Sequence, residues 1–159
     1  PLIWSCRWDS GDNAMYCISR DGTEIKKEEK RITRERSMLR TILDNIPDAI
    51  FAVNKSHQTI LTNKKFYSSY LGKSSEKETL GLQPIDYFPL KEGNEKMADN
   101  EKVMESGIQV INRRDIIYDQ LGKKEVILLT KVPLKFKGEE KAGRVGIAMN
   151  ITASYNYEE

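Results

Sequence analysis

Alternating and apolar runs at the start of the chain predict two short strands. Residues 4–9 alternate large and polar side chains, residues 14–18 form an apolar run, and the Asp-Ser-Gly-Asp-Asn stretch at 9–13 is typical of a turn. A lone hairpin is only marginally stable in water. These strands are therefore expected either to pair with another part of the chain or to belong to a module whose first part is missing.

A seven-residue repeat of large apolar side chains predicts a helix over residues 25–46. The repeat consists of Ile25, Ile32, Leu39 and Ile46. One interpretation is a parallel dimeric coiled coil with Ile32 and Leu39 at the dimer seam. The other is a solvated linker helix, because charged residues stand three and four positions after Ile25 and after Ile32.

After Pro47, which should end this helix, short strands and helices follow one another. Strands are expected at residues 49–53, 58–62, 109–118, 124–134 and 142–151. Helical segments are expected at residues 63–71, 74–80, 84–88 and, as a longer helix, 94–106. This order predicts an α+β domain, a five-stranded antiparallel sheet with short helices on one face, preceded by an amphipathic linker helix.

Several phrases of the sequence, in this order and spacing, resemble the PAS sensor domain. The opening phrase is Leu43-Asp-Asn-Ile-Pro-Asp-Ala-Ile-Phe-Ala-Val53, and the last two strands contain Thr130-Lys-Val-Pro-Leu134 and Val145-Gly-Ile-Ala-Met-Asn-Ile-Thr152. The last phrase is similar to the closing Asp-Ile-Thr signature of the family, with Asn150 in place of Asp. The resemblance covers roughly residues 40–154. It implies a PAS domain at 47–153, signal relay through Asn150 and Thr152, and the start of a signalling linker at 154–159.

The closing signature occurs twice in the chain. Ile18-Ser-Arg-Asp-Gly-Thr-Glu24 lines up with residues 147–153, so that Thr23 matches Thr152. Residues 1–24 therefore look like the last two strands of a preceding PAS repeat, and residues 25–46 like the helix that joins two repeats. We expect the chain to be a piece of a longer sensory protein.

Composition narrows the class of protein. The 159 residues are 38% hydrophobic and 31% charged, with a net charge of +2, which fits a small soluble domain and offers no electrostatic case for nucleic acid. No apolar run is long enough to span a bilayer, so no direct membrane contact is expected. Cys6 and Cys17 with one histidine are too few ligands for a metal site. A reducing, cytoplasmic location is expected. Pairing of the two cysteines is geometrically possible, and a membrane anchor elsewhere in the protein is left open.

No catalytic motif is found, so the domain itself is expected not to be an enzyme. The chain has no Walker loop, no Gly-x-Ser-x-Gly and no His-Glu-x-x-His. The resemblance implies that a haem-binding PAS domain would have a histidine on the long helix at 94–106, and a flavin photosensor a cysteine within 63–106. Neither is present, and His57 is expected to be an exposed turn residue. No cofactor is expected, and an unidentified small-molecule ligand is left open.

Apolar side chains should meet between the sheet and the helices. The expected contributors are Ile50, Val53, Ile60, Phe66, Phe88, Met97, Val103, Met104, Leu129 and Ile147. The candidate polar anchors for a ligand are Tyr87, Asn112, Arg114 and Lys131. Strand alternation places Asn112 and Arg114 on one face and Arg113 on the other. These side chains either line a ligand pocket or fill a solid core, as methionines often do.

The resemblance implies a PAS-type sensory and dimerisation module. Such a module relays a signal to an output domain further along the same chain, most often a histidine kinase of a two-component system. The expected partners are a second copy of the chain and that output domain. The alternative for the domain is a structural spacer with a solid core and no ligand. For the output domain, a cyclase or a transcriptional activator is left open.

Overall fold

The computed structural model describes residues 1–155, which fall into two compact units. One unit spans Pro1–Thr41 and the other begins at Ile42, so the boundary lies within the long helix α1 (Thr23–Asn45). Residues 156–159, most of the expected linker at 154–159, lie outside the described part. Within the described residues, no helix is both long and apolar enough to cross a membrane.

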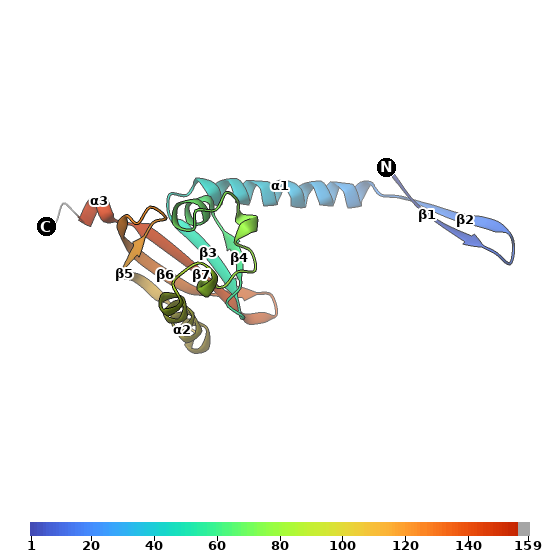
Figure 1. The fold of residues 1–159 in the computed structure, drawn as a ribbon. Coiled ribbons are helices and arrows are strands. Elements are labelled where there is room, and N and C mark those ends of the chain that lie inside the picture. The colour runs from blue at the N-terminus through green and yellow to red at the C-terminus, as the bar shows by residue number, and fades with distance from the viewer. Residues whose placement is uncertain (156–159) are drawn as a thin grey trace. The chain divides into compact units, whose positions relative to one another are not determined.

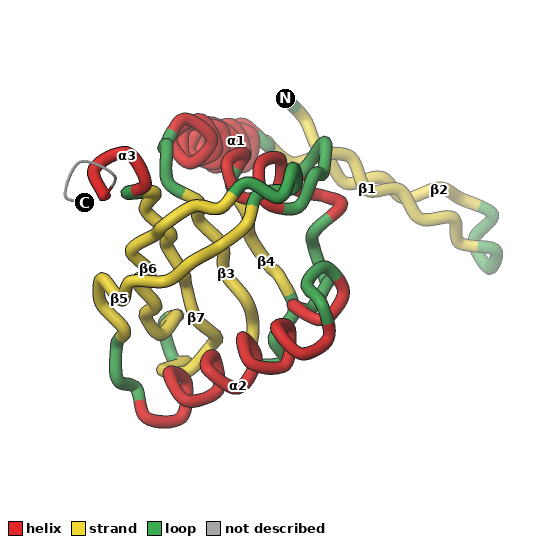
Figure 2. Tube along the Cα trace, turned by 60° about the vertical axis from the view of Figure 1, so that its left-hand side comes forward, coloured by secondary structure: helices red, strands yellow, loops and turns green. Residues whose placement is uncertain are grey.

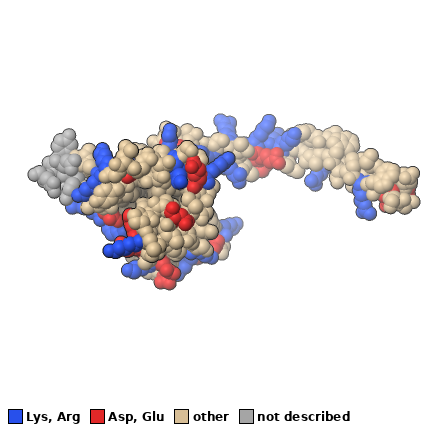
Figure 3. Space-filling view, in the orientation of Figure 1, with Lys and Arg blue, Asp and Glu red and all other residues tan. Residues whose placement is uncertain are grey.

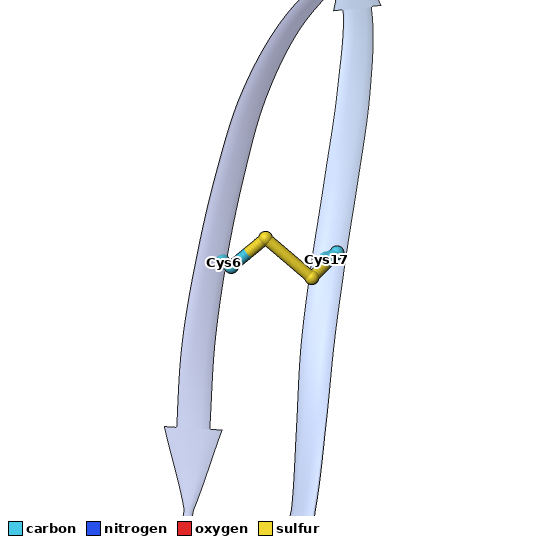
Figure 4. Close-up of a disulfide and its surroundings, with 2 residues drawn as sticks. All are labelled: Cys6 and Cys17. Carbon is cyan, nitrogen blue, oxygen red and sulfur yellow. A yellow bond between two sulfur atoms is a disulfide. The ribbon is translucent and has the colours of Figure 1, made fainter.

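A two-stranded hairpin begins the first unit. Strands β1 (Leu2–Asp9) and β2 (Ala14–Asp21) pair antiparallel, and the Asp9 side chain accepts hydrogen bonds from the backbone N–H groups of Gly11, at 2.8 Å, and Asp12. The register sets Cys6 directly opposite Cys17, with their Cα atoms 4.1 Å apart, and a disulfide joins them (Figure 4). The expectation of reduced cysteines is therefore wrong for this structure, because the strand pairing brings the two side chains together.

Helix α1 has a charged surface with a few exposed apolar side chains. It begins two residues before the expected start, where the Asp21 carboxylate accepts a 2.9 Å hydrogen bond from the Thr23 backbone N–H. Arg31 pairs with Glu28 and Glu35, and Figure 3 shows basic and acidic side chains side by side on this helix. No residue of α1 is buried. Packing within one copy of the chain therefore does not explain its apolar repeat.

Removing residues 1–24 should change the free energy of unfolding of the domain that begins at Ile42 by less than about 1 kcal/mol. The reason is that the hairpin belongs to the other compact unit. Urea denaturation of the full chain and of residues 25–159, followed by the fluorescence of the domain's tyrosines and by circular dichroism, measures the difference. A loss above about 2 kcal/mol, comparable to a core truncation, would contradict independent folding.

The second unit contains the predicted five-stranded antiparallel sheet, which confirms the predicted fold class. Its strands are β3 (Ala49–Asn54), β4 (Thr59–Thr62), β5 (Val110–Tyr118), β6 (Lys124–Phe136) and β7 (Glu139–Asn150). The spatial order is β4-β3-β7-β6-β5, so the first strand of the domain pairs with the last (Figure 1). All neighbouring strands run antiparallel.

Short helices and one long helix connect the two halves of the sheet, and one more helical turn follows the last strand. They are the π-helix η1 (Lys65–Tyr70), the 3₁₀ turns η2 (Glu76–Glu78) and η3 (Pro84–Asp86), α2 (Leu90–Ser106) and the final turn α3 (Thr152–Tyr155). Helix α2, which runs along the sheet in Figure 2, starts at Leu90 rather than at the expected residue 94. Gly93 lies inside it and lets η3 approach, since a Cβ there would be 2.8 Å from the Cα of Ile85.

The core lies on the sheet face that packs against η1. Its buried cluster consists of Ala49, Phe66, Tyr70, Ile117, Ile127, Leu129 and Ala148. Ala49 of β3 pairs with Ala148 of β7, and the next residue pair is Ile50 with Ile147. Because successive side chains of a strand point to opposite faces, Ile50 and Ile147 face the other side of the sheet. The expectation that Ile50 and Ile147 lie on the inner face is therefore wrong, although Ile50 is buried on the opposite face. Ile60, which is exposed, does not contribute to the interior either.

Asn63, at the start of η1, connects three segments of the domain. Its side-chain oxygen accepts hydrogen bonds from the backbone N–H groups of Ile50, at 2.9 Å, and Phe66, at 3.1 Å. Its side-chain NH₂ donates to the carbonyl oxygens of Leu43, at 2.9 Å, and Asp48, at 2.8 Å. Asn63 is fully buried. It therefore holds the end of α1, strand β3 and η1 together and positions Phe66 in the core.

Candidate functional site: a cavity beside the sheet

A cavity of about 360 Å³ lies between the inner face of the sheet and the helices. One part of its wall is aromatic, formed by Phe51, Phe66, Tyr70, Tyr87 and Phe88. The rings contact one another, with centroids 4.9 Å apart for Phe51 and Phe66 and 5.0 Å apart for Tyr87 and Phe88. This volume is at the lower end of the range for small-molecule sites, and an apolar wall is typical of them.

Charged and amide side chains form another part of the wall, which we call the polar end. It comprises Asp99 and Asn100 of α2, Arg113 of β5, Lys131 of β6 and Arg144 of β7. Arg113 binds both carboxylate oxygens of Asp99, at 2.9 and 3.0 Å, and Lys131 donates to the same carboxylate. Lys131 also donates to the side-chain oxygen of Asn100, at 3.2 Å. Three strands and one helix thus meet at one polar cluster.

Burial and neighbouring charges set the protonation of the polar end. Burial, and then the nearby Arg144, lower the pKa of Lys131 to about 8, although its bond to Asp99 opposes this. Burial lowers the pKa of Arg144 to about 9. Burial would raise the pKa of Asp99, but hydrogen bonds from Arg113 and Lys131 outweigh it and hold the pKa well below its usual range. At neutral pH all three groups are therefore charged.

Two tyrosines in the aromatic wall have partners for their hydroxyl groups. Tyr70 donates to the buried Glu125 carboxylate at 2.5 Å, and burial followed by that hydrogen bond raises the pKa of Tyr70. The hydroxyl of Tyr87 lies 3.5 Å from that of Thr59, and burial raises the pKa of Tyr87. Both phenols therefore keep their protons at neutral pH and can act as neutral hydrogen-bonding groups.

The structure brings together four of the eight residues predicted from sequence to line a pocket. Phe66, Tyr87, Phe88 and Lys131 line the cavity. Met97, Met104, Asn112 and Arg114 are not part of its wall. Met104 instead borders a separate surface hollow with Lys55 and Lys141.

An irregularity in β5 explains why Arg113 lines the cavity and Arg114 does not. The β5–β6 register shifts between Val110 and Arg113, and Asn112 adopts a positive φ of 49°. Such a bulge re-aims the side chains that follow it. The prediction of Asn112 and Arg114 as polar anchors is therefore wrong in its geometry, because simple alternation does not continue through a bulge.

Sequence reasoning missed Asp99, Asn100 and Arg144. A signal for Arg144 was present, because Arg144 has the same strand parity as Ala148 and so faces the interior. Asp99 and Asn100 are two polar residues within an amphipathic helix, and only the packing of α2 against the sheet shows that they are turned inward.

His57 lies in the β3–β4 turn, as expected, but it is half-buried rather than exposed. It has a positive φ of 60°, and burial lowers the pKa of its imidazole. It is not part of the cavity wall. Across residues 1–155, no group of three or more His, Cys, Asp or Glu side chains is arranged to hold a metal ion.

The two candidate relay residues lie where β7 passes into α3. The Asn150 side-chain oxygen accepts a 2.9 Å hydrogen bond from the Thr152 backbone N–H, and the Thr152 hydroxyl oxygen accepts one of 2.9 Å from the Val126 backbone N–H. Asp21 and Thr23 repeat the first of these bonds, also at 2.9 Å, where β2 passes into α1. The two strand-to-helix junctions therefore share the same local hydrogen bond.

No family model matches the chain, and no curated protein matches it in sequence. Solved structures do match in fold. The VqmA–ligand–DNA complex of Vibrio cholera has a TM-score of 0.63 at 15% identity, and the match covers 70% of this chain and 50% of VqmA. A PAS domain from Colwellia psychrerythraea has a TM-score of 0.55 at 22% identity over 77% of this chain and 98% of that domain.

A third match is the PAS domain of an HTR-like protein from Haloarcula marismortui. Its TM-score is 0.53 at 20% identity, and the match covers 79% of this chain and 99% of that domain. The chain thus spans about half the length of the VqmA protein but nearly all of each isolated PAS domain. Taken with the strand order β4-β3-β7-β6-β5, these matches show that the domain has a PAS-like fold.

Proposed function

We propose that the chain is a PAS-type sensory and dimerisation module that binds a small molecule in its cavity and relays binding to an output domain of the same protein. The observation that carries this proposal is the cavity of about 360 Å³, which combines an aromatic wall with a polar end in which Asn100, Lys131 and Arg144 are buried. A spacer with a solid core would not need buried charges beside an open volume, since such charges are costly to desolvate. VqmA, a PAS-like neighbour, has been solved bound to DPO, which supports a ligand-binding role.

A histidine kinase of a two-component system is the output that we propose. The relay would pass from β7 through Asn150 and Thr152 to the segment that follows. Thr152 bonds the backbone of β6, so a shift of that strand would move the exit of the chain. Ligand binding has to favour one of two states by only a few kcal/mol to alter the output. A DNA-binding output is the second candidate, because a similar VqmA structure is a complex with DNA.

The chain should form a dimer through α1, with Ile32 and Leu39 at the seam. These two side chains are 37% and 57% exposed in the single copy, and a charged helix of this length gains stability from a partner. Replacing both by Asp would place like charges in the seam, and we expect a folded monomer. Sedimentation equilibrium with circular dichroism measures both properties.

The control for this prediction replaces Lys30 and Ser37 by Asp. These residues are also seven positions apart and exposed, but they lie on a different side of α1. The control variant should remain a dimer. A dimeric Ile32→Asp, Leu39→Asp variant would place the contact outside α1.

Native mass spectrometry of the purified chain, before and after incubation with a fragment library, tests ligand binding. The wild-type chain should carry a bound compound, and the variant Ala148→Phe should not, because Ala148 is buried in the cavity wall and a ring there occupies the volume. Ala98→Phe, at an exposed position of α2 outside the wall, is the matched control and should keep the compound. A wild-type chain that binds no fragment would favour the spacer.

A further inference from the structure

The donors and acceptors of the polar end are unbalanced. Two nitrogens of the Arg144 guanidinium, Nε and Nη1, are buried without a hydrogen-bond partner, and so is the side-chain nitrogen Nδ2 of Asn100. Among the described residues, these three donors are the only unpartnered buried side-chain atoms of the cavity wall. All three lack an acceptor. Because an unsatisfied buried donor is costly, the imbalance indicates that a bound molecule supplies acceptor atoms here.

The orientation of Asn100 follows from its neighbour. Lys131 donates to Asn100 Oδ1, so the oxygen of the amide must face the ammonium group. Turning the amide over would set its NH₂ against a cation. Nδ2 is therefore a genuine free donor, and Asn100 is fully buried.

Arg144 is the most constrained residue of the polar end. Arg144 is only 2% exposed, and its guanidinium carbon lies 5.2 Å from the centre of the Phe51 ring. Phe51 belongs to the aromatic wall, so the cation contacts that wall directly. Asp99, the carboxylate of the polar end, is already bonded by Arg113 and Lys131. Arg144 therefore lacks a carboxylate of its own, although it is buried.

The polar end carries one more positive charge than negative charges. The neighbouring Asp115, which also lines the cavity, pairs with Arg113 at 3.7 Å and is counted with the polar end. Three cations, Arg113, Lys131 and Arg144, then stand against two carboxylates, Asp99 and Asp115. Three more charged groups line the wall. Of these, Glu92 and Lys96 pair with each other at 3.3 Å, and Glu95 is exposed. Arg113 and Asp115 are 43% and 41% exposed and balance each other, so the excess lies on the buried Lys131 and Arg144 with Asp99. One negative charge on a ligand would neutralise it.

We infer that the cavity takes a small organic monocarboxylate, with its carboxylate bound by Arg144 and Asn100 beside Lys131 and its apolar body against the aromatic wall. This rests on the proposed ligand-binding function and names the chemical class of the ligand. A carboxylate supplies two oxygens, each with acceptor capacity for the free donors. A phosphate ester is disfavoured, because its second negative charge would lie beside the ionised Asp99.

Benzoate, its neutral isostere benzamide, and phenyl phosphate are the probes for this inference. The readout is the ¹³C-methyl NMR signals of Ala49 and Ala148, both in the cavity wall, with the exposed Ala98 as a reference that should not shift. Benzoate should bind the full chain at least tenfold more tightly than benzamide and more tightly than phenyl phosphate. Equal affinity for benzamide, or a preference for phenyl phosphate, would overturn the inference and leave the proposed function standing.

Variants assign the selectivity to the polar end. Arg144→Met should remove the preference for benzoate over benzamide without lowering the melting temperature of the ligand-free chain, because it removes an unpartnered buried charge. Lys131→Met should weaken benzoate binding and provides the test if Arg144→Met fails to fold. Lys124→Met, at an exposed position of the same strand, should retain wild-type affinity.

Two further outcomes would count against the inference. Unchanged benzoate selectivity in folded Arg144→Met and Lys131→Met would overturn the assignment of the residues. No methyl shift with any of the three probes would overturn the carboxylate class. If the fragment library still yielded a compound that Ala148→Phe loses, the proposed ligand-binding function would survive that second outcome.

Discussion

Replacing Asn63 by Ala should lower the free energy of unfolding by about 3–5 kcal/mol, which is a large part of the stability of a small domain. The variant removes the acceptor for the N–H groups of Ile50 and Phe66 and the donor for the carbonyl oxygens of Leu43 and Asp48. Each buried polar group left without a partner costs about 1–3 kcal/mol. Water can reach some of these groups after the change, so the losses are not expected to add fully.

Urea denaturation followed by circular dichroism measures this effect. Asn94→Ala is the matched control, because Asn94 is exposed on α2, and its free energy of unfolding should stay within about 0.5 kcal/mol of the wild-type value. An Asn63→Ala variant that loses less than about 1 kcal/mol would show that the end of α1, strand β3 and η1 do not depend on this side chain.

The variant Gly143→Ala should be destabilised by about 3–5 kcal/mol, similar to overpacking a core and straining the backbone together. Gly143 is in β7 opposite Asn54 of β3, with a φ of +155°. A Cβ at this position would overlap the carbonyl oxygen of Val53 and lie 2.9 Å from the Cα of Asn54. Both are backbone atoms, so the strands must separate at the position next to Arg144.

Gly138→Ala separates the steric effect from the conformational one. Gly138 also has a positive φ, +83°, but a Cβ there would meet nothing within 4 Å. Its substitution should cost about 1–2 kcal/mol, the usual penalty for a left-handed residue. Chemical denaturation of the two variants gives the comparison. Equal losses would contradict a close approach of β3 and β7 at Gly143.

Pattern and turn residues were sufficient to predict most of the architecture. The alternation of residues 49–53 and 58–62, the glycine that ends the long helix and the three long strands depend on neighbours close in the chain. Local signals of this kind predicted the five strands and their antiparallel pairing. They misplaced the start of α2, because a glycine inside a helix looks like a break unless the segment packed against it is known.

The polar end of the cavity shows where local signals stop being informative. Arg144 could be assigned to the interior by strand parity, but nothing in the sequence indicates that Asp99 is bonded by Arg113 and Lys131 rather than by Arg144. The bulge before Arg113 depends on how β5 pairs with β6. Because of this bulge, Arg113 lines the cavity in place of Arg114, which had been predicted to do so. The Cys6–Cys17 bond likewise depends on the register of the hairpin.

The sequence by itself determined the order of the elements, the PAS-like class of the domain and half of the predicted pocket residues, because periodicity and turn chemistry are properties of short segments. Only the tertiary structure decided that an open volume remains beside the aromatic wall, and that Asn100 and Arg144 enter it with unpartnered donors. Long-range strand register and the packing of α2 bring these groups together from positions 44 residues apart. Because these groups are buried, their unpaired charge and missing hydrogen bonds cost free energy.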